Sequence, residues 1–123
     1  MNNKVFLIDI DGTVCDDINN EDSHLYSEAE PFPDALETLN RWYDEGAHIT
    51  FFTAREEKDR LVTELWLRKN GFKYHGLVMG KPRCKDDQEY HWIDNRKVRA
   101  TQYLSEFTDL VKKNVDIEVF KND

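Results

Sequence analysis

The stretch Lys4-Val5-Phe6-Leu7-Ile8-Asp9-Ile10-Asp11-Gly12-Thr13 decides how the rest of the chain is interpreted. It begins as a short, continuous apolar run rich in branched residues, which is typical of a buried strand. The Asp-Gly step that follows indicates a turn. Asp9 and Asp11 are two residues apart, so the alternation of side chains along a strand would point both carboxylates the same way. The stretch therefore predicts a buried strand that ends in a pair of acids.

Apolar runs alternate with amphipathic segments along the remainder of the sequence. Further strands are expected at Ala47–Phe52, Leu77–Met79, Tyr90–Ile93 and Ile117–Phe120. Helices are expected from Pro33 to Gly46, from about Glu56 to Asn70, and over apolar positions between Val98 and Val111. This alternation predicts right-handed βαβ units. We expect one α/β domain over residues 1–123, a doubly wound, Rossmann-like and mostly parallel sheet with helices on both faces.

Residues 14–32 show no regular apolar spacing, are rich in acids and contain Pro31. We expect them to form an exposed loop or flap close to the end of the first strand, with its acids solvated.

The composition favours an ordinary soluble domain, with 39% hydrophobic and 34% charged residues. No apolar run reaches the roughly 20 residues that a membrane helix needs, and the first residues lack the pattern of a signal peptide. We therefore expect a cytoplasmic protein without a membrane partner. The net charge of −8 argues against nucleic acid as a partner. Cys15 and Cys84 do not form a disulfide framework.

Polar side chains follow each of the predicted strands. They are Asp9 and Asp11, then Thr53, Lys81 and Asp94. Because ligands of parallel sheets bind outside the carboxyl ends of the strands, we expect these side chains to converge there. Two close carboxylates repel unless a cation lies between them or one keeps its proton, and with a third they supply the oxygen ligands that Mg²⁺ prefers. A lysine and a hydroxyl suit phosphoryl oxygens, so the set favours phosphoryl transfer to or from a small phosphorylated substrate.

Four motifs in this order resemble those of the haloacid dehalogenase-like hydrolases and span residues 5 to about 95. The motifs are Asp9-Ile10-Asp11-Gly12-Thr13-Val14, Phe52-Thr53-Ala54-Arg55, Gly80-Lys81-Pro82 and Trp92-Ile93-Asp94-Asn95. The first motif is highly specific after an apolar strand, whereas the other three are weak singly. Neither gap between the first three motifs has room for a cap domain, so we expect a cap-less member with an open site.

The resemblance implies a role for each matching residue. Asp9 would attack phosphorus and form an aspartyl-phosphate, while Asp11 would act as the general acid and then as the general base. Mg²⁺ would be held by the Asp9 carboxylate, the main-chain carbonyl of Asp11 and the Asp94 carboxylate. Thr53 would bond the phosphoryl group, and Lys81 would offset the charge of Asp9. The residues expected to contact substrate are Gly12, Thr53, Ala54, Arg55 and Lys81.

Several points remain open. Asn95 stands where many members have a second acid, and we expect this amide to weaken metal binding. Arg55 is as well suited to a surface pair with Glu57 or Asp59 as to substrate. The favoured interpretation is a phosphatase of small phosphates such as sugar phosphates, and the alternatives are a protein phosphatase and a non-catalytic phosphate-binding or receiver-like domain. An open site also favours a homo-oligomer, in which a neighbouring subunit closes it.

Overall fold

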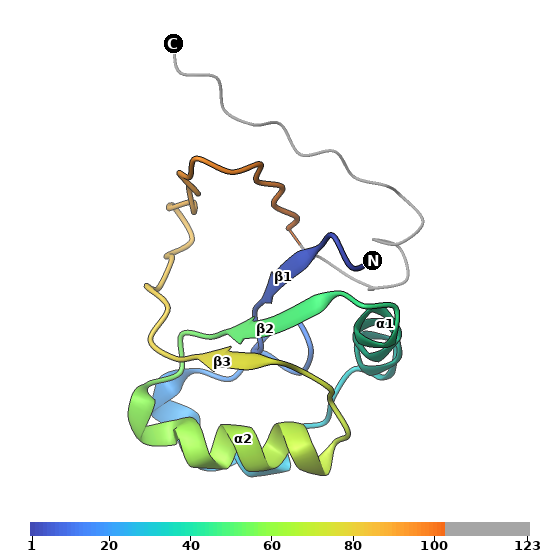
Figure 1. The fold of residues 1–123 in the computed structure, drawn as a ribbon. Coiled ribbons are helices and arrows are strands. Elements are labelled where there is room, and N and C mark those ends of the chain that lie inside the picture. The colour runs from blue at the N-terminus through green and yellow to red at the C-terminus, as the bar shows by residue number, and fades with distance from the viewer. Residues whose placement is uncertain (103–123) are drawn as a thin grey trace.

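The computed structural model describes residues 1–102. In this part of the chain, the sheet contains β1 (Val5–Ile8), β2 (His48–Phe52) and β3 (Gly76–Val78), which are parallel and lie in the order β1-β2-β3 (Figure 1). Helix α1 (Pro33–Asp44) connects β1 to β2, and α2 (Arg60–Lys69) connects β2 to β3. Parallel neighbours require such crossovers. The predicted α/β class is confirmed.

The two α-helices form where the apolar spacing predicts them. Pro33 starts α1 and Gly46, with φ +97°, follows its end, so the helix has the usual proline start and glycine stop. Its buried side chains, Ala35, Leu39 and Trp42, recur at helical spacing. The second helix is preceded by a 3₁₀ turn, η2 (Glu57–Asp59). Within residues 1–102, none of the helices combines the length and the apolar character needed to cross a membrane.

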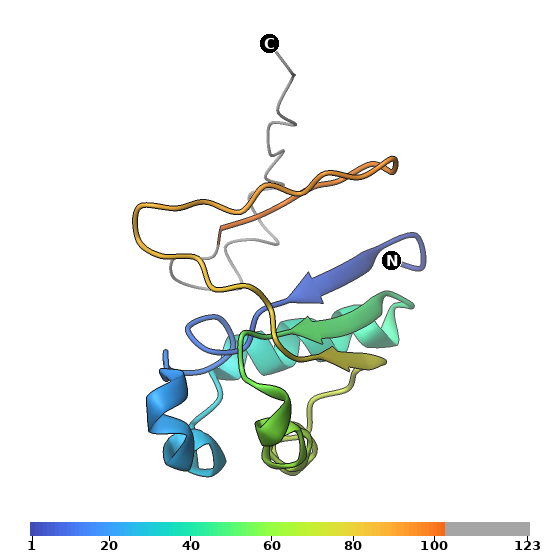
Figure 2. The same ribbon diagram turned by 90° about the vertical axis from the view of Figure 1, so that its left-hand side faces the viewer.

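The helices of the described residues lie on one face of the sheet (Figure 2). Ile8, Ile49 and Phe51 belong to the core on this face, together with apolar side chains of α1 and α2. Residues 81–102 leave the carboxyl end of β3 and pass beyond β1, at the edge of the sheet (Figure 1; Figure 2). Strand residues that point away from the helices are more exposed, among them Val5 and Val78. Helices on both faces are thus not seen within residues 1–102.

The prediction of a strand at Tyr90–Ile93 is wrong, because these residues have no regular secondary structure. Tyr90 is 55% exposed and Ile93 94% exposed, so the apolar run is not buried in a sheet. A short apolar run does not by itself specify a strand, since pairing depends on a neighbour. Val98, at the start of the predicted helix, is also irregular. The rest of that helix and the strand Ile117–Phe120 lie outside the described residues.

The acidic segment 14–32 is not the exposed flap that its composition predicts. It contains a 3₁₀ helix, η1 (Asn20–Glu28), in which Tyr26 is fully buried. The Trp66 indole Nε1–H of α2 donates to the Ala29 carbonyl oxygen at 2.8 Å, which fixes the end of the segment. The buried Tyr26 ring and the hydrogen bond from the Trp66 indole attach the segment to the core, in spite of its acidic composition. Such isolated anchors give no periodic signal.

Trp66 should be the most costly side chain of α2 to remove. It is 2% exposed, stacks on Phe72 and bonds to Ala29. Trp66→Ala is expected to lower the free energy of unfolding by about 3–5 kcal/mol, because it leaves a cavity and an unpaired carbonyl. Urea denaturation measures this. Leu65→Ala, at a 53% exposed position of the same helix, is the control and should stay within about 0.5 kcal/mol.

Candidate active site

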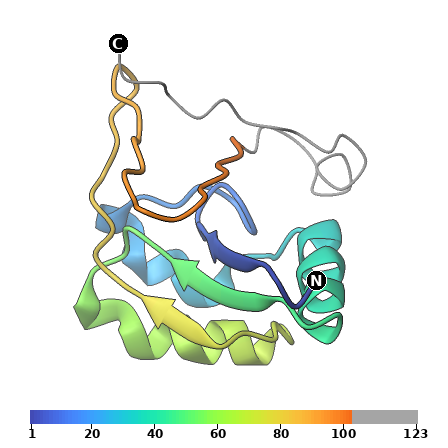
Figure 3. The ribbon, with the colours of Figure 1, turned by 45° about the horizontal axis from the view of Figure 1, so that its top comes forward.

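The carboxyl ends of the three parallel strands point to the same edge of the sheet (Figure 3). A hollow of about 230 Å³ lies there. Its lining comes from the segments that follow β1 and β3 and from Ala54 after β2. The lining residues are Asp9, Asp11, Asp17, Ile18, Ala54, Lys81, Arg83, Cys84 and Tyr90.

Asp9 lies directly beyond β1 and is open to the hollow, with a side chain 35% exposed. Its Oδ1 is 3.3 Å from the ammonium Nζ of Lys81, and its Oδ2 accepts a hydrogen bond of 3.1 Å from the Thr13 hydroxyl. The lysine places a positive charge beside the carboxylate, and the Thr13 hydroxyl orients it. The structure therefore places an accessible carboxylate beside a cation, which is the arrangement that a nucleophile toward an anionic ester needs.

Asp11 is held by Arg55, and this contact was not predicted. The guanidinium Nε and Nη2 donate to Oδ2 and Oδ1 of Asp11 at 2.9 and 2.8 Å. The Arg55 side chain is 0% exposed and that of Asp11 is 13% exposed. A bidentate pair of this kind fixes the plane of the carboxylate as well as its position. Asp11 therefore faces the hollow in one orientation.

The surroundings of Arg55 compensate its buried charge. Nη1 donates to the Thr63 hydroxyl of α2 at 3.1 Å, and the guanidinium carbon lies 3.8 Å from the centre of the Tyr26 ring. Burial, followed by the negative charge of Asp11, raises the pKa of Tyr26, so this ring stays neutral over the guanidinium. Within residues 1–102, Arg55 forms no ion pair with Glu57 or Asp59 and does not line the hollow, so neither the expected surface pair nor the expected substrate contact is seen there.

The loops after β2 and β3 are joined by main-chain hydrogen bonds. The Lys81 amide donates to the Thr53 carbonyl at 2.9 Å, and the Gly80 amide donates to the Arg55 carbonyl at 2.8 Å. Thr53 is 1% exposed, and its hydroxyl accepts from the Arg55 amide at 3.2 Å. Ala54, rather than Thr53, lines the hollow. Thr53 therefore shapes the loop that presents Ala54, because its hydroxyl bonds the amide two residues further on, as in an ST-turn.

Gly12 has φ +83°, and its amide donates to the Cys15 carbonyl at 2.9 Å. A Cβ built at this glycine would lie 3.3 Å from Cγ of Asp17. The tight turn thus needs glycine and brings Asp17 to the hollow. Asp17 could not be identified from the sequence, because nothing in the acidic segment distinguishes it from its neighbours.

Cys15 is buried behind Asp11, and its Sγ is 3.8 Å from Oδ1 of that residue. Burial, with a smaller contribution from Asp11, raises the pKa of the thiol to about 12. The thiol stays protonated at neutral pH, so Cys15 packs beneath the site and is not a nucleophile.

Asp94 does not line the hollow. Its carboxylate accepts hydrogen bonds of 3.1 Å from the Trp92 indole and from the Arg96 amide, and the first of these is the larger reason that the pKa of Asp94 is lowered. Among residues 1–102, no group of three or more histidines, cysteines or acids could hold a metal ion. Asp9 is a hard oxygen donor of the kind that Mg²⁺ prefers, whereas the Asp94 carboxylate does not reach the hollow in which Asp9 lies.

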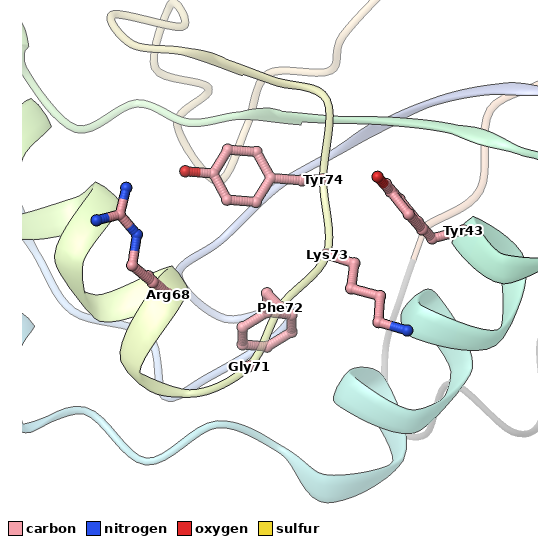
Figure 4. Close-up of a pocket in the computed structure, with 6 residues that line it drawn as sticks. All are labelled: Tyr43, Arg68, Gly71, Phe72, Lys73 and Tyr74. Carbon is pink, nitrogen blue, oxygen red and sulfur yellow. The ribbon is translucent and has the colours of Figure 1, made fainter.

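A larger hollow, of about 590 Å³, lies between α1 and the segment from α2 to β3 (Figure 4). Arg68 and Lys73 line it together with aromatic side chains, and no acid does. The Lys73 ammonium is paired with Asp44 at 2.8 Å. Residues 71–74 precede β3, so this hollow is at the edge opposite to the carboxyl ends of the strands. It lacks the carboxylates and the position that a phosphoryl-transfer site of this fold requires.

A family model described as PITM 1-3, LNS2 domain matches residues 6–121 of the chain. A Bacillus cereus protein, provisionally named a nucleotidase, is 33% identical over 79 residues, which are 63% of this chain and 40% of the relative. The chain therefore spans about two fifths of the length of this curated relative.

Two solved structures are similar in fold. A crystal structure of a protein from Vibrio cholerae has a TM-score of 0.56 and 26% identity, over 91% of this chain and 99% of that chain. A chain of the Pnkp1/Rnl/Hen1 complex has a TM-score of 0.54 and 19% identity, over 92% of this chain and 34% of that chain. The second likeness shows the fold alone.

The buried pair of Arg55 and Asp11 should dominate the stability of this edge of the sheet. Arg55→Met is expected to lower the free energy of unfolding by about 3–5 kcal/mol, because it leaves a carboxylate without a partner. In an Asp11→Asn background the same change should cost less, and urea denaturation of the four proteins gives the coupling. Lys58→Met, which removes an exposed pair with Glu56, is the control. Equal costs in both backgrounds would show that the pair is not coupled.

Proposed function

The chain belongs to the family described as PITM 1-3, LNS2 domain, and from this premise we propose that it is a phosphohydrolase of phosphate monoesters that works through an aspartyl-phosphate on Asp9. One observation carries the proposal. The accessible carboxylate of Asp9 lies 3.3 Å from the Lys81 ammonium in a hollow at the carboxyl edge of a parallel sheet, beside an oriented second acid, Asp11. The family membership and the nucleotidase-named relative support hydrolysis of phosphate esters.

The residues of the hollow would divide the reaction between them. An oxygen of Asp9 attacks phosphorus, the phosphorus–oxygen bond of the ester breaks, and the leaving oxygen takes a proton from Asp11. Asp11 must bind this proton from solvent before the first turnover, because its carboxylate is paired with Arg55 in the structure. Water then attacks the aspartyl-phosphate and gives its proton to Asp11, which releases phosphate and restores Asp9. Lys81 offsets the charge that gathers between Asp9 and the ester. Arg55 keeps Asp11 in place during both steps.

We propose Mg²⁺ as the cofactor, which would neutralise charge on the phosphoryl group. Asp9 supplies one carboxylate, and the main-chain carbonyl of Asp11 is the second donor that the sequence resemblance implies. Asp94 enters this set through the resemblance alone, because its carboxylate bonds to Trp92 and Arg96 in the structure.

We also propose that the domain is cap-less and acts on a small phosphate ester. Residues between Val14 and Thr53 form η1, α1 and β2, and those between Ala54 and Lys81 form η2, α2 and β3. These elements leave no room for a cap domain in either gap. An open site of this kind gains from closure by a second copy of the chain, so we propose a homo-oligomer as the active form.

A second candidate is a domain that binds a phosphorylated ligand without hydrolysing it. The position of Asp94 outside the hollow favours this candidate, since among the described residues the expected metal ligands are not assembled. Turnover of 4-nitrophenyl phosphate separates the two. Binding of inorganic phosphate with no hydrolysis of any tested ester would support the second candidate.

Asp9→Asn is expected to reduce kcat on 4-nitrophenyl phosphate by several orders of magnitude while the protein stays folded, because the amide is nearly isosteric but a poor nucleophile. Steady-state kinetics and far-ultraviolet circular dichroism give the two readouts. Asp86→Asn, at an exposed position of the loop after β3, is the matched control and should retain wild-type activity. An Asp9→Asn enzyme within tenfold of wild type would exclude the aspartyl-phosphate mechanism.

Activity is expected to require Mg²⁺, with Ca²⁺ a poor substitute because Ca²⁺ prefers more ligands at longer distances. Asp94→Ala should raise the Mg²⁺ concentration needed for half-maximal activity, or abolish activity. Asp87→Ala, an exposed acid on the same loop, should not. Titration of Mg²⁺ after removal of metals with a chelator measures both. Full activity in excess chelator would contradict the cofactor, and an unchanged requirement in Asp94→Ala would remove only this ligand.

A further inference from the structure

The hollow is larger than the reacting group needs, and part of its lining has no role in the proposed hydrolysis. Arg83, Cys84 and Tyr90, from the loop after β3, lie on it together with Ile18. Lys81 already offers its ammonium to Asp9. A second cation, Arg83, therefore remains at a site whose chemistry requires only one.

Arg83 is not paired with an acid within the part of the chain that the structure describes, although Asp17 also lines the hollow. None of the ion pairs of residues 1–102 includes it, and no hydrogen bond in that part of the chain joins it to Asp9 or Asp11. Its Nη2 donates instead to the neutral amide oxygen of Asn20 at 2.5 Å. The positive charge is thus available to an anion that enters the hollow.

Asn20 holds the arginine in position. The same amide oxygen accepts from the Tyr26 hydroxyl at 3.1 Å, and the amide Nδ2 donates to the Ala54 carbonyl at 3.1 Å. Tyr26 is buried, and Ala54 belongs to the loop after β2. An exposed arginine usually loses much rotamer entropy when it binds a ligand. Here the hydrogen bond to Asn20 already restricts the side chain of Arg83 in the unbound protein, so less entropy is lost on binding.

Tyr90 adds an apolar surface to the part of the hollow that Lys81 and Arg83 line. Its hydroxyl donates to the Pro82 carbonyl, and its ring centre is 5.0 Å from the Lys81 ammonium. The residue is 55% exposed, so the ring is fixed at its hydroxyl while much of its surface remains accessible. Such a ring accepts the face of a sugar or a base by stacking.

We propose that Arg83 is a specificity residue that binds a second anionic group on the leaving alcohol, so that the preferred substrate is a bisphosphate rather than a simple monoester. The inference rests on the proposed function. The phosphoryl group that reacts contacts Lys81 near Asp9, and the second phosphate contacts Arg83. Asn20 holds Arg83 through a hydrogen bond and is itself bonded to the loop after β2. The alcohol between the two phosphates lies against Tyr90.

The test compares esters that differ in the second phosphate alone. One arm uses fructose 6-phosphate and fructose 1,6-bisphosphate, and the other uses adenosine 5′-monophosphate and adenosine 3′,5′-bisphosphate. Wild-type enzyme should have a KM about tenfold lower for the bisphosphate of at least one arm, which is the effect of one charge-assisted hydrogen bond near solvent. The arm that shows the difference identifies the alcohol as a sugar or a nucleoside.

Arg83→Gln should remove this difference by raising KM for the bisphosphate about tenfold, with kcat and the KM of the monophosphate changed less than threefold. Arg83→Lys should keep part of the preference, because the charge remains. Arg68→Gln, at the exposed arginine of the other hollow, is the matched control and should keep all of it. Urea midpoints equal to wild type show that the variants are folded.

The outcomes separate this inference from the proposed function. An enzyme that hydrolyses monophosphates and 4-nitrophenyl phosphate through Asp9, but shows no preference for either bisphosphate, overturns the inference and leaves the function standing. The inference is also overturned if Arg83→Gln raises KM equally for the monophosphate and the bisphosphate of one arm, since Arg83 would then bind the reacting phosphate. An enzyme that hydrolyses none of the esters contradicts the function itself.

Discussion

The buried ion pair between Arg55 and Asp11 is the interaction on which the candidate site depends. An arginine that is 0% exposed costs much free energy unless its charge and its N–H groups are satisfied. Asp11, Thr63 and the face of Tyr26 satisfy them. These partners come from the turn after β1, from α2 and from η1, so one guanidinium connects three parts of the chain that are far apart in sequence. The carboxylate of Asp11 points into the hollow because the arginine beneath it allows little else.

Much of the fold follows from local patterns. The strands and the two α-helices up to Val78 form where apolar period and turn residues predict them, because each buries one continuous face against the same core. The meeting of Asp9, Asp11 and Lys81 follows from topology, since parallel strands bring their carboxyl ends to one edge. These features need only the order of elements and not the packing of any side chain.

The features that could not be predicted depend on partners distant in sequence. An arginine is usually a surface residue, and nothing in the sequence around Arg55 indicates that Tyr26 and Thr63 will enclose it. Tyr26 itself lies in an acidic segment whose average polarity conceals a single buried ring. Conversely, Tyr90–Ile93 has the apolar character of a strand but lies outside the sheet, because a run of this length does not determine what it pairs with.

The arrangement also bears on how an acidic chain would bind the phosphate ester that we propose as its substrate. Although the chain has a net charge of −8, Lys81 and Arg83 line the hollow together with the carboxylates of Asp9, Asp11 and Asp17, and Arg55 is buried beneath Asp11. The acids follow β1 and the cations follow β2 and β3, so the order of the strands brings opposite charges together at this edge of the sheet. Two of the cations are paired with acids. The third, Arg83, donates to the neutral amide oxygen of Asn20, and it is this cation that our proposal assigns to an anion from outside the chain.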